Sequence, residues 1–598
     1  MKKLIATISL LLAAVLALTA CGGGSPSGTA TTAAQAAETT AAQTTASAQA
    51  TAEATTAAAE PGGAEEGFDA DHNWLGPVTE LTIFGVEAGG DFDERKDLPI
   101  PKELEKKTGV RLTWSQGTNE KWALMQSAGD LTDIVRVGAS DAKTTSALIQ
   151  SGYIYDFDSL LEQWGPNLMA NMGKQLEVSK AVHGGMYLIP TNTGPGAMLY
   201  YPMLKWIPYR DAGYPEIRDM DTLIEAFVKM TEVMPVTPEG KKVYAFSSFI
   251  DWGNTFPFFY PWASALGYDS VGGWSWADQE TMELVHQLSD DSRSVYWWTV
   301  ELMYRLNKLG LFDPDTFTQT WEEMLEKRKA QQVLFAHGFW DRPALFNEDE
   351  ELLDTYFPVR WEGAGVQGGA FNYLYEMGFV ISSKCKNPEA AVRLYDYCAS
   401  FEGAELILNG IEGEDWNLVN GVPLPTDAII EARKAGTDLG KTRGIGYGGY
   451  NFLVGISGLT VDPRYDAYVD FTYAPEVQRL AYNELDNEII KYFSADYIND
   501  IIYDAIASGK QHDMSKYDAL VPKQIPTPPT DITRISTDIQ QLAAAEWAPN
   551  LVYAKSDAEF QSLKEEAIAA FNEAGLAEMN QWYATNWEEA KVKAAAFN

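Results

Sequence analysis

Residues 378–398 read GFVISSKCKNPEAAVRLYDYC and join a predicted strand to a predicted helix. The apolar residues 379–381 predict the strand. Pro388 is suited to the first turn of the helix, where its missing N–H costs nothing, and Glu389 lies near the positive end of the helix dipole. Three larger or apolar residues then fall on one helix face, namely Ala391, Leu394 and Tyr395. The stretch therefore predicts a strand followed directly by a helix.

The same alternation begins near residue 80, which predicts an α/β fold with mainly parallel sheets. Residues 81–84 predict a first strand, and residues 101–107 predict a helix that Gly109 ends. Apolar residues then alternate with polar ones over residues 110–114, as expected for a second strand. Loops at the carboxyl ends of such strands commonly bind ligands, so the loop at residues 89–91 is a candidate.

Several segments resemble the extracellular solute-binding proteins of family 1, particularly their long lipoprotein members. They are residues 106–110, 129–135, 148–161, 186–190, 306–314, 378–391 and 546–587. The resemblance spans about residues 78–595, and each motif is structural rather than chemical. It implies a two-lobed, periplasmic-binding-protein-like fold of type II, in which a cleft between the lobes closes on a ligand by hinge rotation.

Chain length also favours two lobes, because the part of the chain that follows Ala70 exceeds the usual size of one core. The resemblance places connections between the lobes near residues 190–200 and 370–380. We therefore expect lobe 1 to combine residues 71–190 and 375–430. Lobe 2 is expected to combine residues 191–374 and 431–598.

Residues 1–20 predict a secretory signal peptide, with Lys2 and Lys3 before an apolar run. Residues 18–21 resemble a bacterial lipobox, which makes Cys21 the expected site of lipidation by palmitate and related acyl chains. Residues 21–70 are rich in Ser, Thr and Ala and predict a disordered linker, with a glycosylated stalk as the alternative. The expected location is the cell surface, on the outer face of the cytoplasmic membrane.

The formal net charge of −39 argues against nucleic acid as a partner, because phosphate binding needs a concentrated basic surface. After Cys21, only Cys385 and Cys398 remain, so no dense disulfide framework holds the fold. Their spacing is compatible with a bridge, but two free buried thiols are the preferred interpretation.

No sequence motif predicts a cofactor or a metal site. Residues 444–449 satisfy G-x-G-x-x-G, yet a polar run precedes them where a dinucleotide site needs an apolar strand. Residues 436–442 resemble a phosphate loop with one residue too few between the glycines. The turn at residues 237–244 lacks the spaced carboxylates of the calcium loop found in many long relatives, so we expect no calcium there.

The chain is rich in aromatic residues, with 18 Trp, 29 Tyr and 25 Phe. Aromatic rings stack on the apolar faces of sugars, although most of these residues are expected to serve the core. Residues 335–341 resemble a family strand that ends in a ligand-stacking tryptophan, which makes Trp340 the first candidate. The other candidate ligand contacts lie in polar or glycine-rich surroundings: Trp252, Trp274, Trp276, Asp91, Tyr447 and Tyr450.

These observations predict a monomeric, lipid-anchored binding protein that delivers a small solute to the permease subunits of an ABC importer and catalyses no reaction. The aromatic residues favour an oligosaccharide or a related polyhydroxylated solute. A peptide or another nutrient is the alternative ligand, because the same fold accepts many solutes. A surface glycosidase, and a chemosensory or adhesive role without transport, are further alternatives.

Overall fold

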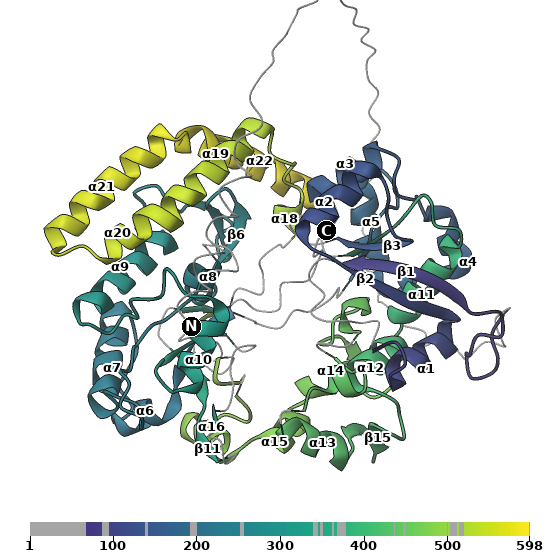
Figure 1. The fold of residues 1–598 in the computed structure, drawn as a ribbon, viewed down its shortest axis with the longest axis horizontal. Coiled ribbons are helices and arrows are strands. Elements are labelled where there is room, and N and C mark those ends of the chain that lie inside the picture. The colour runs from purple at the N-terminus through teal and green to yellow at the C-terminus, as the bar shows by residue number, and fades with distance from the viewer. Residues whose placement is uncertain are drawn as a thin grey trace, which may run out of the picture. The chain divides into compact units, whose positions relative to one another are not determined.

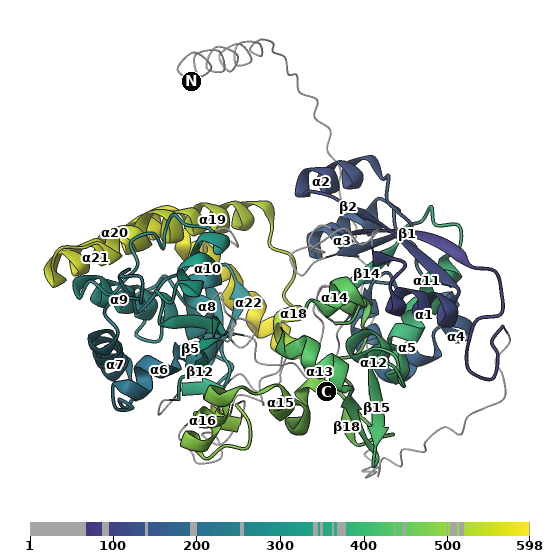
Figure 2. The same ribbon diagram turned by 60° about the horizontal axis from the view of Figure 1, so that its bottom comes forward.

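A computed structural model describes most of the chain from Gly67 onward (Figures 1 and 2). The described residues are 67–85, 95–137, 142–191, 200–250, 256–338, 345–346, 351–360, 364–366, 378–435, 437–446, 450–498, 500–502, 511–513 and 520–596. The two largest clusters of buried apolar side chains form two separate cores, one around a five-stranded sheet and the other around helices with two smaller sheets. We call the one built around β1 the first core and the other the second core.

The first core surrounds a five-stranded sheet with the order β2-β1-β3-β14-β4. Its strands are β1 (Thr79–Gly85), β2 (Val110–Gln116), β3 (Ile134–Val137), β4 (Ile189–Pro190) and β14 (Gly378–Ile381). β1 runs parallel to β2 and β3, whereas β14 is antiparallel to β3 and β4. The expectation of mainly parallel sheets therefore fails in this sheet only at β14, which lies between β3 and β4 and runs opposite to the other four strands.

Helices cover both faces of this sheet. Leu81 and Ile83 of β1 pack toward one face, with α1 (Pro99–Thr108), α4 (Leu161–Trp164), α5 (Pro166–His183), α11 (Pro388–Cys398) and α12 (Phe401–Asn409). Phe84 points to the opposite face, with α2 (Asn119–Ala128) and α3 (Ala142–Gln150). This three-layer arrangement follows from the alternation of side chains along a strand.

The predicted join between α1 and β2 is confirmed. Gly109 ends α1 with a left-handed φ of 64°, and a Cβ at this position would collide with the ring of Trp74. Only glycine meets both requirements without strain. Val110, Leu112 and Trp114 of β2 are buried in alternation, as the sequence predicts.

The strand and helix predicted at residues 378–398 are also confirmed. Pro388 opens α11, and the ring of Tyr395 stacks on Phe379 of β14 at 4.6 Å between centroids. The carboxylate of Asp396 accepts hydrogen bonds from the amide of Asn167 at 2.8 Å and from the backbone N–H of Leu168 at 2.9 Å. α11 therefore joins the sheet to the start of α5.

The second core contains two antiparallel sheets. One has the order β12-β5-β9 and consists of β5 (Tyr200–Lys205), β9 (Phe335–Gly338) and β12 (Tyr356–Pro358). The other consists of β6 (Tyr268–Gly272), β7 (Ser275–Asp278) and β8 (Leu284–His286). Short two-stranded pairs also occur, such as β10 (Leu345–Phe346) with β11 (Leu352–Asp354) and β13 (Ala364–Val366) with β19 (Gln511–Asp513).

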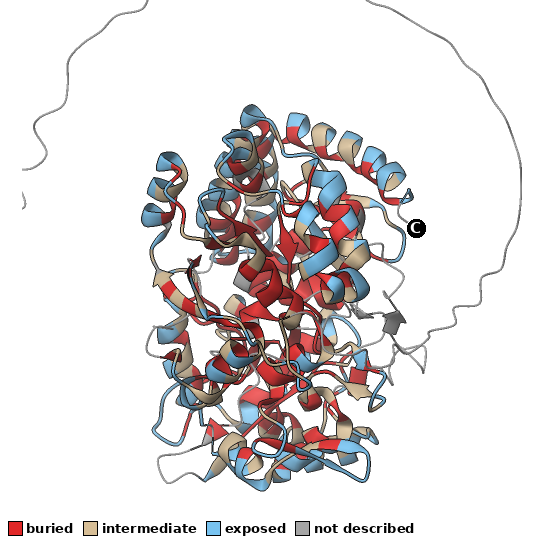
Figure 3. Ribbon diagram, turned by 90° about the vertical axis from the view of Figure 1, so that its right-hand side faces the viewer, coloured by how far each residue is buried: buried red, intermediate tan, exposed pale blue. Residues whose placement is uncertain are grey.

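Helices supply most of the second core. Figure 3 shows that helices of the chain carry buried residues on one side and exposed residues on the other. The longest helices of the second core are α7 (Met220–Val233), α8 (Phe256–Leu266), α9 (Val295–Lys308), α19 (Thr530–Gln540), α21 (Asp557–Glu573) and α22 (Leu576–Ala594). The shorter ones are α6 (Trp206–Asp211), α10 (Trp321–Lys329), α16 (Glu484–Phe493) and α20 (Ala548–Val552), with a π-helical stretch at Gln541–Trp547. α18 (Leu520–Lys523) packs in a separate small cluster with the C-terminal half of α22.

The boundary expected at residue 430 differs from the one in the structure. Tyr450, Leu453 and Val469 are buried in the first core, and the second core resumes only at Leu485. Gly455 explains the close packing, because its N–H donates to the carbonyl of Cys398 at 3.0 Å and a Cβ there would meet Ala399 at 2.8 Å. The elements after α12 add two small apolar clusters beside the first core, one around Ile429 and one around Trp416. These elements are β15 (Trp416–Val419), β16 (Val422–Pro425), α13 (Asp427–Lys434), α14 (Leu439–Thr442), β17 (Val461–Asp462), β18 (Ala467–Tyr468) and α15 (Pro475–Ala481).

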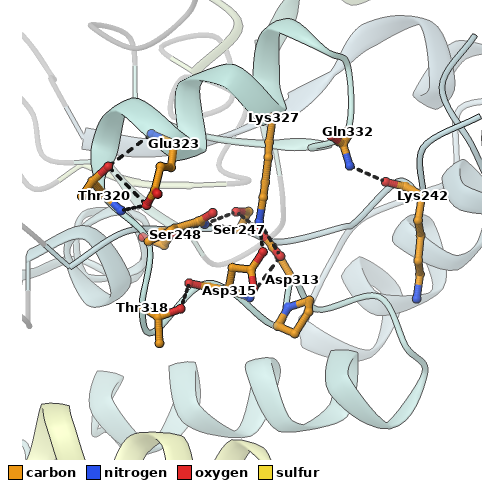
Figure 4. A network of polar contacts seen from close by, with 12 residues as sticks. Lys242, Ser247, Ser248, Asp313, Asp315, Thr318, Thr320, Glu323, Lys327 and Gln332 are labelled. Atoms are coloured by element: carbon orange, nitrogen blue, oxygen red, sulfur yellow. Dashed lines mark hydrogen bonds and ion pairs between the residues drawn. The ribbon is translucent and has the colours of Figure 1, made fainter. Parts of the chain in front are cut away.

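A polar network fixes the loops beside α10 in the second core (Figure 4). Lys327 donates to both carboxylate oxygens of Asp313, at 2.9 and 2.8 Å, and to Asp315 at 2.7 Å. The side chain of Asp313 is fully buried and also accepts from Ser247 at 2.7 Å. Because a buried carboxylate needs a counter-charge, Lys327 holds this part of the core together.

We expect Lys327→Met to lower the free energy of unfolding by about 3 kcal/mol, since it leaves the buried Asp313 carboxylate without its cation. Urea denaturation followed by tryptophan fluorescence measures the loss. Lys329→Met is the matched control, because Lys329 is exposed and its partner among the described residues is the exposed Glu326. Equal stability of the two variants would contradict this role of Lys327.

Two carboxyl groups share one arginine at α12. Arg464 donates to Glu405 at 2.8 Å and to Asp462 at 2.6 Å, and both acids are almost fully buried. Burial raises the pKa of Glu405 to about 9, and its hydrogen bond to Asp462 acts in the same direction. Despite its burial, hydrogen bonds from Arg464 and Glu405 hold the pKa of Asp462 below its usual value.

This pair makes stability depend on pH. The folded chain keeps the Glu405 proton up to about pH 9, whereas the unfolded chain releases it near its ordinary pKa of 4.5, so stability falls as pH rises between these values. We expect Glu405→Gln to flatten this dependence and to exceed the wild type in stability by at least about 1 kcal/mol at the alkaline end.

Urea denaturation at several pH values between acid and pH 9 tests the expectation. Glu402→Gln is the control, since Glu402 also pairs with Arg464 but its side chain is 67% exposed. A wild-type pH profile that Glu405→Gln leaves unchanged would refute the assignment.

Candidate functional site

A pocket of about 540 Å³ opens beside α12, α13 and α14 in the first core. These helices lie together in Figures 1 and 2. The lining residues come from α12, α13, the segment at residues 437–446 and two flanking loops: Leu408, Arg433, Thr437, Asp438, Leu439, Gly440, Lys441, Ile445, Gly446, Arg95, Asp470 and Thr472. Its volume lies within the range of small-molecule sites, which is about 300–1,000 Å³.

The pocket wall combines apolar and charged groups. Ile445 is buried with Ile100 and Ile429 in a small apolar cluster, which Leu439 extends. Arg95 is only 7% exposed, and burial lowers the pKa of Arg433 while the charge of Asp470 opposes that shift. Arg433 nevertheless stays charged at neutral pH, because the guanidinium pKa lies far above it.

The acidic groups of the pocket have partners within the chain. Asp438 accepts from the backbone N–H of Lys441 at 3.0 Å, and the Lys441 ammonium lies 3.3 Å from its carboxylate. Asp470 accepts from the N–H and the hydroxyl of Thr472, at 2.9 and 2.6 Å. Burial raises the pKa of Asp470, although the Thr472 hydrogen bonds act against this shift.

The two glycine-rich motifs of the sequence border this pocket. The segment that resembles a phosphate loop forms the short α14 after its N-cap Asp438, and no strand directly precedes it among the described residues. The G-x-G-x-x-G segment follows α14 directly, so it too lacks the strand of a dinucleotide site. Gly446 donates its N–H to the carbonyl of Ile407 at 2.8 Å, which ties the segment to α12. These motifs therefore shape a pocket wall.

Three predicted ligand contacts lie in the described residues, and all three are buried. Trp274, in the turn between β6 and β7, is 7% exposed, and its ring lies 5.4 Å from that of Tyr296. Trp276 in β7 is 5% exposed within the second core. Tyr450 is 3% exposed in the first core, with its ring 5.6 Å from Phe452. The structure thus packs all three as core residues, and their contact with a solute stays a prediction.

The remaining candidates, Asp91, Trp252, Trp340 and Tyr447, lie outside the described residues. Two of them are close in sequence to the pocket wall, since Asp91 shortly precedes Arg95 and Tyr447 follows Gly446. The sequence therefore indicates the neighbourhood of the pocket but not its basic residues. Lys441 lies in the polar run at residues 434–443, before the glycine segment, and Arg433 directly precedes that run.

The turn at residues 237–244 is closed by its own hydrogen bonds. Glu239, its only carboxylate, accepts from the Thr237 hydroxyl at 2.8 Å, and Thr237 donates its N–H to the carbonyl of Lys241 at 2.7 Å. Among the described residues, no group of three or more His, Cys, Asp and Glu side chains is arranged to hold a metal ion. That this turn binds no calcium stays a prediction.

Cys385 and Cys398 are both free thiols in the structure. Burial raises the pKa of Cys385 to about 11 and also raises that of Cys398. Both are therefore thiols rather than thiolates at neutral pH. Within the described part of the chain, none of the helices combines the length and apolar composition needed to cross a bilayer.

The chain crosses between the two cores after β4, before β14 and between Val477 and Leu485. This arrangement defines a two-lobed binding protein. The chain belongs to the bacterial extracellular solute-binding protein family, whose model matches residues 89–405. The members of this family are binding proteins. A comparison with curated protein sequences finds no match.

Solved structures share this fold. The alginate-binding protein AlgQ2 without calcium ion is 16% identical, with a TM-score of 0.55 over 88% of this chain and 100% of that one. The ABC-transporter substrate binding protein FusA of S. pneumoniae, in complex with kestose, is 16% identical, with a TM-score of 0.57 over 86% and 100%. A solute-binding protein from Bifidobacterium longum infantis that binds HMO is 15% identical, with a TM-score of 0.51 over 85% and 98%.

Proposed function

We propose that this protein is the lipid-anchored solute-binding component of an ABC importer and that it binds an oligosaccharide or a related polyhydroxylated solute by closure of its lobes. Membership of the extracellular solute-binding family carries the proposal. The similar structures add support for the ligand class, because AlgQ2 binds alginate, FusA was solved with kestose and the Bifidobacterium protein binds HMO.

The proposed mechanism is binding without catalysis. The solute holds the two lobes in a closed arrangement, and the permease recognises the surface that closure creates. Transport energy comes from a separate ATPase chain. The aromatic candidates led by Trp340 would stack on sugar rings, and polar groups would pair with the hydroxyls. A peptide, another nutrient or glycosidase activity would each give a different result in the binding experiment below.

Thermal unfolding of residues 71–598 in the presence of candidate solutes tests the ligand class. A solute that binds only the folded chain raises the unfolding midpoint with the logarithm of its concentration. We expect one class of oligosaccharide to raise it, and we expect Trp340→Ala to weaken that binding at least about tenfold without changing the midpoint of the ligand-free protein.

The panel includes neutral and acidic oligosaccharides, peptides and polyamines, and the products of each incubation are analysed for cleavage. A shift produced only by peptides would replace the ligand class while leaving the importer role intact. Cleavage of an oligosaccharide with turnover would refute the binding-only role.

The lipid anchor requires its own test, because Cys21 lies outside the described residues. We expect the wild-type protein to incorporate labelled palmitate and to sediment with membranes, since a thioether-linked lipid and an acylated N-terminus supply more than one anchoring chain. Cys21→Ala should abolish both. Membrane association that persists in Cys21→Ala would exclude anchoring through this residue.

A further inference from the structure

The pocket beside α13 gathers positive charge in a strongly acidic chain. Arg95, Arg433 and Lys441 face two carboxyl groups there, whereas the whole chain carries a formal charge of −39. This local excess of cations is the feature that the proposed function does not explain, because a neutral sugar needs no net charge from its site.

The Arg433 side chain provides the main evidence for what this pocket binds. Its guanidinium makes no hydrogen bond or ion pair with any other group of the described chain, and its electrostatic interaction is with Asp470. The side chain is nevertheless partly withdrawn from water, which lowers its pKa. A guanidinium carries five N–H donors, and their desolvation is costly unless an acceptor replaces the lost water.

The carboxylates of the pocket do not fill this role. Asp438 is engaged by the backbone N–H and the ammonium of Lys441, and Asp470 by the N–H and hydroxyl of Thr472. The Arg433 fork therefore remains available to an acceptor that enters from outside.

The rest of the wall suits a sugar ring. Leu408, Leu439 and Ile445 supply an apolar surface, and Thr437 contributes a hydroxyl near the cations. A pyranose that carries an acid group presents the same combination, with an apolar ring face and an oxyanion at its edge.

We propose that this pocket binds the oxyanion of an acidic saccharide, a carboxylate or a sulfate ester, and that Arg433 pairs with that group directly. The proposal rests on the proposed function and narrows its ligand class from oligosaccharides in general to acid-bearing ones. Arg95 and Lys441 add positive potential to the same pocket, and a bidentate pair with Arg433 fixes the orientation of the acid.

Isothermal titration calorimetry of residues 71–598 tests this assignment with matched ligands. The probes are tri-galacturonate, the neutral trisaccharide obtained by reduction of its carboxyl groups, and a tri-galactose that carries 6-sulfate. We expect at least one acidic trisaccharide to bind at least about tenfold more tightly than the neutral one, because only the acid can pair with the guanidinium. The two acidic probes distinguish a carboxylate from a sulfate ester.

Arg433→Gln should remove this preference, and Arg433→Lys should keep part of it, because the ammonium retains the charge but not the fork. Lys434→Gln is the matched control: it neutralises the adjacent residue of α13, which pairs with Glu431 at 3.0 Å and does not line the pocket. We expect this control to bind acidic ligands like the wild type.

The outcomes separate the two proposals. Equal binding of acidic and neutral trisaccharides, or an acid preference that Arg433→Gln leaves intact, overturns the pocket assignment while oligosaccharide binding stands. If Arg433→Gln and Lys434→Gln weaken the binding of acidic trisaccharides equally, the preference for acids comes from overall charge. That result also overturns the pocket assignment. If none of the three trisaccharides binds and no oligosaccharide raises the unfolding midpoint in the wider panel, the proposed ligand class fails together with this inference.

Discussion

The first core depends on the way in which Arg393 of α11 is held. Its guanidinium lies 3.7 Å from the centre of the Trp74 ring, and its Nε donates to the carbonyl of Thr108 at 2.7 Å. Thr108 is the last residue of α1, so one side chain joins the incoming segment, α1 and α11. The stacking lowers the free-energy cost of burying the guanidinium, because this group is weakly hydrated and its flat face packs well on an aromatic ring.

The contact between Arg393 and Trp74 also determines how the neighbouring elements pack. Trp74 occupies the space that Gly109 leaves free, which lets α1 turn sharply into β2. On the other side, Asp396 of the same helix holds the start of α5. The sheet, three helices and the segment before β1 are thus fixed by two charged residues of α11. The pocket lies outside this group of elements, beside α12, α13 and α14.

Many of the aromatic side chains that the structure describes serve core packing. Trp206 and Trp262 are fully buried, and Trp262 stacks on Phe335 at 5.3 Å. Trp274 and Trp276 follow the same rule, although their glycine-rich surroundings made them candidates for a ligand. Composition could not separate the two uses, because a ring that packs on a core and one that stacks on a sugar obey the same preference for flat apolar contact.

By itself the sequence determined the local structure. The turn at Gly109, the start of α11 at Pro388 and the order of strands and helices all follow from backbone preferences and from the period of apolar residues, which act over a few neighbours. The predicted export signal at residues 1–20 rests on local sequence in the same way. Only the tertiary structure decided that β14 runs antiparallel, that residues 450–469 pack in the first core and that Arg95, Arg433 and Lys441 share one pocket. These three features depend on contacts between residues far apart in the chain. A local sequence pattern does not predict which distant segment a helix or strand packs against.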